Sequence, residues 1–332
     1  MQIKQAILDC EKQAVKRFLQ TFNLKYLNDV DYTFYLEDEN CVIGTVSLAK
    51  NVICDLAVSD KYQGENLATT LISHAISKLR EDKIYDYKVF TKPEYLDKFL
   101  SLGFNLLIKT HDFVSLEGGE SNVYRTIDNL KVKIKMDLGG LDNDYGAIVM
   151  NANPFTLGHL SLLEYALSKH NKVLIFILEE DKSEFSFKER FSLAFLATRQ
   201  YADRVCVLPS TNYIISSETF PDYFIHEKTA LTKAHAEYDA MIFEKYFMKE
   251  LKIAKRYIGS EVKDYMSLYN DSLKKILNDK VEIVDRFTLA NTVVSASTVR
   301  DYIKSNNVEK ALELVPTSTK AVLKMIIVGK QW

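Results

Sequence analysis

The nine residues Asn151–His159, NANPFTLGH, combine side chains that bind phosphate with the pattern of a strand-to-helix turn. The apolar run GAIVM before them predicts a strand, and Pro154 followed by Gly158 predicts a loop that leads into a helix. The first N–H groups of a helix lack partners within the helix and lie at its positive end, so a phosphate chain binds there. Gly158 would let a ligand approach the backbone, while Thr156 and His159 would donate to phosphoryl oxygens.

Two further segments carry residues of the same chemistry. Taken alone, the T-x-G-H tetrapeptide is more often a helix cap followed by a partly buried neutral histidine. Lys182 follows the next predicted strand and Arg190 lies in the helix after it, although such cations are usually solvated surface charges. Near the far end of the chain, Ser297 and Thr298 start a predicted helix that carries Arg300. This helix start is either an ordinary cap or a second anion-binding N-terminus.

The elements that must position these residues alternate along residues 145–332. Strands are expected at 146–151, 172–180, 204–210, 238–243, 255–260 and 281–287. Helices are expected at 158–170, 187–202, 244–252, 268–279, 295–306, 308–315 and 317–329. Strands separated by helices predict a parallel sheet of the Rossmann type, and ligands of such sheets lie beyond the carboxyl ends of the strands.

Residues 1–116 predict a separate α/β domain. Helices are expected at 11–22, 65–83 and 93–103, and strands between them and after them. The residues EDEN at 37–40 predict the tip of a hairpin. Residues 117–144 begin with EGGES and have mixed periodicity, so we interpret them as a linker or connector.

Composition excludes several classes of protein. The chain of 332 residues has a formal net charge of −2, so no overall basic field would attract nucleic acid or an acidic membrane. No run approaches the ~20 apolar residues of a membrane span, and a soluble, cytoplasmic protein is expected. The cysteines lack metal-ligand or C-x-x-C spacing, so neither a metal centre nor a disulfide framework is expected: Cys10, Cys41, Cys54 and Cys206.

The segments N-P-F-T-x-G-H, D-K-S-x-F-S-F-x-x-R and S-A-S-T-V-R together resemble the nucleotidyltransferase superfamily with the H/TxGH signature. With YIISSETFPDYF and DYMSLYNDSLK, nearly the whole chain resembles the citrate lyase ligases. This resemblance implies that ATP, with Mg²⁺, activates acetate as acetyl-AMP and releases pyrophosphate. The acetyl group would then pass to the thiol of the phosphoribosyl-dephospho-CoA group on the acyl carrier subunit of citrate lyase, which activates that enzyme and leaves AMP.

The same resemblance implies roles for individual residues. The catalytic candidates are His159, Thr156, Lys182 and Arg300. The ATP-binding candidates are Asn151, Asn153, Pro154, Phe155, Gly158, Arg190, Gly259, Glu261, Ser297 and Thr298. ATP is expected across the ends of the first and fourth predicted strands, with Asp239 as a weaker candidate near the nucleotide. Acetate would attack the α-phosphorus in line, so catalysis would depend on positioning and charge neutralisation.

The stretch VICDLAVSDKYQGENLATTLISHAI resembles the acetyl-CoA-binding core of GNAT acetyltransferases, whose sheet is mixed. The residues implied to bind a CoA-like thiol arm are Val58, Gln63, Gly64, Asn66, Leu67 and Ala68. Asn66 replaces a glycine of the pattern, and asparagine tolerates the left-handed backbone that the turn needs. Phe99 stands where these enzymes often carry a tyrosine acid, and phenylalanine cannot donate a proton. Binding of the arm is therefore favoured over acetyl transfer, with a domain that retains only the fold as the alternative.

Two other functions agree with these motifs. One is an adenylyltransferase that joins ATP to a phosphorylated coenzyme precursor, which would also release pyrophosphate. The other is a non-catalytic sensor of nucleotide or acyl-CoA, which would bind without turnover. Removal of the His159 side chain separates the classes, because an enzyme would lose turnover and a sensor would lose only affinity.

Overall fold

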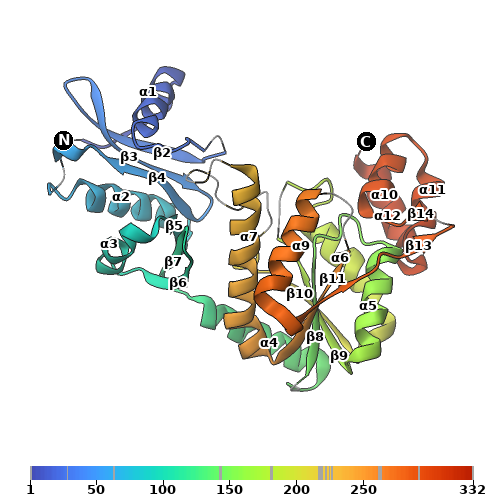
Figure 1. Cartoon of the computed structure of the whole chain (residues 1–332). Coiled ribbons are helices and arrows are strands. Elements are labelled where there is room, and N and C mark those ends of the chain that lie inside the picture. The colour runs from blue at the N-terminus through green and yellow to red at the C-terminus, as the bar shows by residue number, and fades with distance from the viewer. Residues whose placement is uncertain are drawn as a thin grey trace. The chain divides into compact units, whose positions relative to one another are not determined.

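The computed structural model describes residues 2–27, 29–62, 64–141, 144–179, 182–215, 220, 223, 225, 227–260, 264–290 and 292–330 (Figure 1). Two of the candidate residues, Gln63 and Glu261, lie outside these ranges. The chain divides into two units. The first contains residues 1–122 and 221–234, and the second contains residues 123–220 and 235–332.

The first unit is built on a mixed sheet, as the sequence predicts. Within the described residues its strand order is β1-β2-β3-β4-β5-β7-β6. The strands are β1 Lys4–Gln5, β2 Tyr32–Asp38, β3 Cys41–Ala49, β4 Val52–Val58, β5 Asp86–Thr91, β6 Asn105–Lys109 and β7 Val114–Gly119. Only β4 and β5 pair in parallel, and the other neighbours are antiparallel. The helices are α1 Asp9–Gln20, α2 Leu67–Glu81 and α3 Leu96–Ser101.

Local sequence explains two features of this unit. Glu39 and Asn40 join β2 to β3 with φ angles of 46° and 62°, which is the left-handed pair of a tight hairpin turn. Helix α2 buries Leu71, Ile72, Ala75 and Leu79, whose spacing places them on one face of the helix. That face packs into the core formed by the central strands of the sheet.

The second unit is built on a parallel sheet with strand order β10-β9-β8-β11-β12. The strands are β8 Tyr145–Met150, β9 Lys172–Ile177, β10 Val205–Pro209, β11 Ile253–Gly259 and β12 Val281–Val284. The helices are α4 Val123–Leu138, α5 Leu157–Lys169, α6 Phe187–Thr198, α7 Lys228–Ile242, α8 Lys249–Leu251, α9 Asp264–Leu277, α10 Ala296–Lys304, α11 Val308–Glu313 and α12 Thr317–Lys330. Strands β13 Thr288–Leu289 and β14 Thr292–Val293 form a small hairpin before α10.

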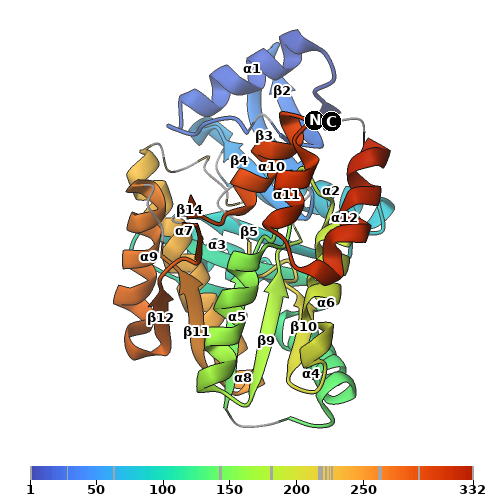
Figure 2. The ribbon, with the colours of Figure 1, turned by 90° about the vertical axis from the view of Figure 1, so that its right-hand side faces the viewer.

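The order of these strands defines where a ligand would bind. The chain passes from β8 to β9 on one side and from β11 to β12 on the other, so the direction of winding changes between β8 and β11. A crevice forms beyond the carboxyl ends of strands at such a point. Figure 2 shows α5 and α6 over one face of the sheet, with α10 and α11 beyond the arrowhead of β9.

A single core joins the C-terminal helices to the sheet. Ile148 and Ile175 from the sheet share this core with Leu163 of α5, and Val299 and Ile303 of α10 belong to it as well. All five side chains are nearly or fully buried. This packing holds the start of α10 near the loop between β8 and α5.

The prediction of a strand at 238–243 is wrong. These residues form the end of α7 and the first residue of a π-helical turn, Phe243–Met248. Phe243 and Phe247 stack with centroids 5.9 Å apart, and both contact Phe176 of β9. A short, mostly apolar segment such as YDAMIF does not distinguish a buried helix from a strand, and these contacts with the sheet resolve the ambiguity. The fourth strand along the second unit is therefore β11.

Residues 117–144, which we interpreted as a linker or connector, contain regular secondary structure. Strand β7 continues to Gly119, and α4 occupies residues 123–138. The buried positions of α4 recur at helical spacing, which is the signal that the mixed periodicity obscured: Val123, Ile127, Leu130, Ile134 and Leu138.

Candidate active site

The loop between β8 and α5 fixes the protonation of His159. Thr156 is the N-cap of α5, and its backbone N–H donates to Nδ1 of His159 across 3.0 Å. A backbone N–H can only donate, so Nδ1 accepts and the neutral ring carries its proton on Nε2. Burial, together with the nearby charge of Arg286, lowers the pKa of His159 to about 4. At neutral pH His159 is therefore an uncharged N–H donor in the first turn of a helix.

Thr156 has a different role from the one expected. Its side chain is 1 % exposed, and its hydroxyl oxygen lies 3.0 Å from Nδ1 of His159. The hydroxyl is thus turned toward the imidazole, and Thr156 orients His159 instead of contacting phosphate directly. The ring of Phe155, also buried, lies 5.3 Å from the imidazole between centroids and supports its other side.

The start of α10 lies against the start of α5. A Cβ atom placed on Gly158 would lie 2.7 Å from the carbonyl oxygen of Val294. Gly158 therefore accommodates the chain before α10, whereas the sequence suggested that it accommodates a ligand. Ser295 is the N-cap of α10 and accepts from the Thr298 N–H at 3.1 Å. Two helix N-termini, from segments distant in sequence, converge here.

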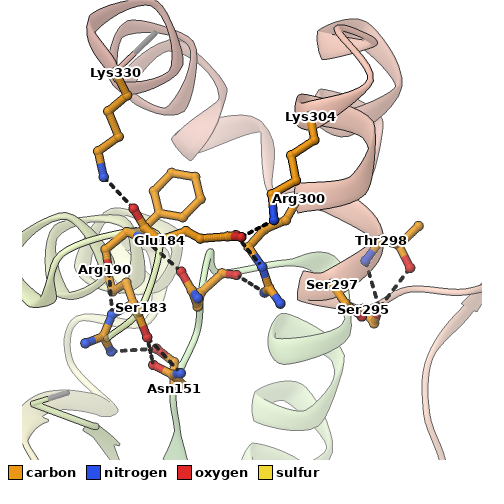
Figure 3. A network of polar contacts seen from close by, with 12 residues as sticks. Asn151, Ser183, Glu184, Arg190, Ser295, Ser297, Thr298, Arg300, Lys304 and Lys330 are labelled. Carbon is orange, nitrogen blue, oxygen red and sulfur yellow. Dashed lines mark hydrogen bonds and ion pairs between the residues drawn. The ribbon is translucent and has the colours of Figure 1, made fainter. Parts of the chain in front are cut away.

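The hydroxyl groups at the start of α10 form a small cluster (Figure 3). The Ser295 oxygen lies 2.8 Å from the Ser297 hydroxyl and 2.8 Å from the Thr298 hydroxyl. The sequence pointed to Ser297 and Thr298, and it missed Ser295 as the cap. The signal that could have found it is its position three residues before Thr298, which is the usual spacing between an N-cap and the N–H that it accepts.

Arg300 joins α10 to the loop after β8 and to the loop after β9. Its Nε forms an ion pair with Glu184 at 2.6 Å, and its Nη1 donates to the Asn153 carbonyl at 2.6 Å. Lys304 contacts the same carboxylate of Glu184 (Figure 3). Sequence reasoning missed Glu184 and Lys304, although Arg300 and Lys304 are separated by one helical turn and so share a face.

The expected phosphate contact of Arg190 is corrected. Its side chain is fully buried, and its Nε donates to the Phe185 carbonyl at 3.0 Å. Its Nη1 donates to the carbonyls of Asn151 at 2.8 Å and Leu178 at 2.7 Å. Arg190 therefore connects the end of β8 to the loop after β9. Buried carbonyl groups need hydrogen-bond donors, and this one guanidinium supplies them to carbonyls of both segments.

The polar side chains that precede α5 serve mainly to hold the loop. Asn151 donates from Nδ2 to the Ser183 hydroxyl at 3.0 Å. Asn153 is 9 % exposed and accepts from the Phe185 N–H at 3.0 Å through Oδ1. Pro154 follows Asn153 in a cis peptide bond. The contacts of Asn151 and Asn153 join the loop before α5 to the loop after β9.

Other candidates lie at the edges of this region. Lys182 is exposed in the loop after β9, two residues before Glu184. Gly259 ends β11 next to β8, and its carbonyl accepts from the Asn270 side chain at 3.2 Å. Asp239, the weaker candidate, is buried in an ion pair with Arg256 at 2.8 Å, so its role is structural.

In the first unit, a turn with left-handed backbone leads into α2. Asn66 has φ 55° and ψ 20°, and Gly64 has φ 97°. The predicted left-handed conformation at Asn66 is confirmed. Leu67 begins α2 and Ala68 follows it, so their N–H groups belong to the unsatisfied first turn. Val58 ends β4 just before this turn.

Strands β4 and β5 pair only near the start of β4 and separate toward its end at Val58. Their pairing is limited to Val52 with Lys88 and Ile53 with Val89. The next carbonyl of β5, at Phe90, accepts instead from the hydroxyl of Tyr223, a buried residue of the 221–234 segment. Phe99 is 5 % exposed and packs edge-on against Phe104, so it is a core residue.

The described parts of the chain contain no group of three or more His, Cys, Asp or Glu residues arranged to hold a metal ion. None of their helices has the length and apolar character needed to span a membrane.

Comparison with known proteins agrees with both halves of this description. The acetyltransferase (GNAT) domain family matches residues 6–112, and the citrate lyase ligase C-terminal domain matches residues 145–323. These two matches define the class of protein as a ligase with a GNAT-type domain.

Full-length relatives extend the match. The "[Citrate [pro-3S]-lyase] ligase" of Haemophilus influenzae is 30% identical over 316 residues, which is 92% of each chain. Relatives of the same name from Klebsiella pneumoniae and Escherichia coli are 30% and 29% identical and cover 94% of this chain. The chain belongs to the citrate lyase ligase family and is an enzyme of the ligase class.

Proposed function

We propose that this enzyme uses ATP to acetylate the thiol of the phosphoribosyl-dephospho-CoA group on the acyl carrier subunit of citrate lyase. The observation that carries the proposal is the meeting of two helix openings at Gly158 and Val294. Beside them, His159 presents a neutral N–H whose tautomer is fixed by Thr156. Such an arrangement binds a phosphate chain with oriented N–H groups from two directions.

The first step is formation of acetyl-AMP. An oxygen of acetate attacks the α-phosphorus of ATP, and the bond from that phosphorus to the bridging oxygen breaks, so pyrophosphate leaves. His159 donates its Nε2–H to a phosphoryl oxygen, while Arg300, Lys182 and the start of α10 neutralise the leaving pyrophosphate. No protein nucleophile is needed, because positioning and charge stabilisation supply the rate enhancement.

Mg²⁺ would arrive with ATP. Around the start of α5 the Leu157 N–H already donates to the Leu314 carbonyl. The imidazole N–H of His159 and the guanidinium of Arg300 fit phosphate oxygens and do not form a carboxylate cage. When bound, Mg²⁺ neutralises phosphate charge while keeping mostly phosphate and water ligands.

The second step is thioester formation. The sulfur of the carrier-bound arm attacks the carbonyl carbon of acetyl-AMP, AMP leaves, and the thiol proton is released. We assign the turn Gly64–Ala68 and the end of β4 to binding of the arm, since this turn begins α2 with exposed backbone donors. Because Phe99 has no proton to give, the first unit would bind the arm without catalysing acetyl transfer from acetyl-CoA. We place the reaction in the cytoplasm, where ATP and the coenzyme-derived carrier are available.

The decisive experiment measures pyrophosphate release from ATP with acetate, propionate or citrate, in the presence and absence of the thiol-bearing carrier protein. We expect release that depends on acetate and rises when the carrier is added, together with a carrier mass increase of one acetyl group. Formation of a dinucleotide from a phosphorylated coenzyme precursor would instead show an adenylyltransferase. Nucleotide binding without any pyrophosphate release would show a sensor.

A further inference from the structure

The carboxylate of Glu184 forms ion pairs with two cationic side chains on one face of α10. Its Oε2 pairs with Nε of Arg300 at 2.6 Å, and its Oε1 contacts Nζ of Lys304 (Figure 3). Arg300 and Lys304 are four residues apart in α10, so both reach the same carboxylate. A single negative charge thus lies between two positive ones.

Arg300 connects this cluster to the loop before α5, whereas Lys304 is the last residue of α10. Arg300 also donates to the carbonyl of Asn153, which is in the loop before α5. The start of α10 faces Gly158 through Val294. Arg300 therefore lies where the proposed function needs a cation for the β- and γ-phosphates of ATP, and Lys304 adds a second cation through the shared Glu184 carboxylate.

The carboxylate of Glu184 can release these cations while its backbone stays in place. Lys330 donates to the Glu184 carbonyl at 2.8 Å and pairs with Glu189 at 2.5 Å, so α12 holds the loop independently of the Glu184 side chain. The side chains of Glu184, Arg300 and Lys304 are 31%, 25% and 55% exposed. Ion pairs with this exposure contribute little to stability. A phosphate group with several charges forms stronger charge-assisted bonds to the same cations.

We propose that Arg300 and Lys304 form a two-cation clamp for pyrophosphate, and that Glu184 occupies the clamp as an internal stand-in anion when no phosphate is bound. ATP displaces Glu184 on binding, and Glu184 takes the clamp back as pyrophosphate leaves. This inference rests on the proposed function, and it adds Lys304 and Glu184 to the site. Its consequence is that Glu184 weakens pyrophosphate binding and speeds product release.

The first test measures binding of inorganic pyrophosphate by calorimetry to the full-length protein, to Glu184→Gln and to Lys304→Met. Glu184→Gln removes the competing charge, so we expect roughly fivefold tighter binding. Lys304→Met removes one cation and should bind several-fold more weakly. Glu309→Gln is the control, because the exposed Glu309 side chain pairs with Lys324 and contacts neither clamp cation, and its affinity should equal that of the wild type. Unchanged or weaker binding in Glu184→Gln would overturn the inference.

The second test is a double-mutant cycle of Glu184→Gln and Lys304→Met, measured by denaturant unfolding with and without saturating pyrophosphate. We expect a favourable coupling between the two side chains in the ligand-free protein and its loss when pyrophosphate is bound. A coupling that persists with pyrophosphate shows that the ion pair is purely structural. That result overturns this inference and leaves the proposed function standing. Acetate-dependent ATP–pyrophosphate exchange by the wild type reports separately on the proposed function. If the wild type binds no pyrophosphate, both proposals fail.

Discussion

The α-carbon of Gly158 faces the carbonyl oxygen of Val294 so closely that an added Cβ would lie 2.7 Å away. The contact is between backbone atoms of two segments that are more than 130 residues apart in sequence. It brings the start of α5 and the start of α10 together, and the chemistry proposed for the site depends on this approach.

Gly158→Ala tests that contact. The new methyl group meets a backbone oxygen that cannot rotate away, so α5 and α10 must move apart. We expect stability to fall by about 1–3 kcal/mol, as for other overpacked positions, and ATP affinity to fall with it. Gly140→Ala is the control, because a Cβ at Gly140 meets no atom within 4 Å. Denaturant unfolding and ATP titration measure both effects, and a Gly158→Ala protein with normal ATP affinity would contradict the two-helix site.

His159→Ala tests the proposed N–H donor. The substitution removes the Nε2–H and leaves the Thr156 N–H without its acceptor. Loss of one donor to a transition-state oxyanion typically costs about 10²–10³ in kcat, and we expect a decrease of that size in acetate-dependent pyrophosphate release. His111→Ala is the control, since the His111 side chain is exposed in the first unit. Loss of ATP affinity with unchanged kcat would instead indicate a binding residue.

The pH dependence of stability follows from the pKa of His159. In the folded protein this pKa is lowered to about 4, so between pH 4 and pH 6.5 the unfolded chain binds a proton there that the folded protein does not. The free energy of unfolding therefore falls as pH drops from 6.5 to 4, by about 1–3 kcal/mol from this residue. His159→Asn cannot titrate and should lack that part of the slope. Unfolding curves of both proteins at several pH values give the difference, and identical slopes would show that His159 titrates normally.

Arg190→Met separates a structural role from a nucleotide contact. The substitution leaves the carbonyls of Asn151, Leu178 and Phe185 without their buried donor. We expect the free energy of unfolding to drop by about 3–5 kcal/mol, with the KM for ATP unchanged in protein that remains folded. Arg199→Met, at an exposed position, should change stability by less than about 0.5 kcal/mol. If Arg190→Met were stable and bound ATP more weakly, the result would support the ATP contact that the sequence suggested for Arg190.

Asn66 offers a test of the thiol-arm site. Its backbone is left-handed, with φ 55°, which glycine adopts readily and a β-branched residue does not. Asn66→Gly should bind dephospho-CoA as the wild type does. Asn66→Val should strain the turn by about 1–2 kcal/mol and weaken binding roughly tenfold. Calorimetric titration of the full-length proteins measures the difference, and equal affinities would exclude this turn as the anchor of the arm.

Several features were readable from the sequence because they depend on neighbouring residues. Alternating strands and helices after residue 145 predicted the parallel sheet, and EDEN predicted the β2–β3 hairpin. The left-handed backbone at Asn66 followed from the side chain that stands there. The strand-loop-helix pattern around NPFTLGH located the start of α5 to within a residue.

Only the tertiary structure decided the contacts across long sequence distances. Residues 238–243 lie in a helix and not in a strand because Phe243 and Phe247 pack against Phe176. Similarly, the partners of Arg190 and Arg300 are set by loops that meet only once the sheet has formed. Periodicity reports which face of an element is buried, but a cation pairs with whichever acceptor the folded chain brings within reach, and that choice has no local signal.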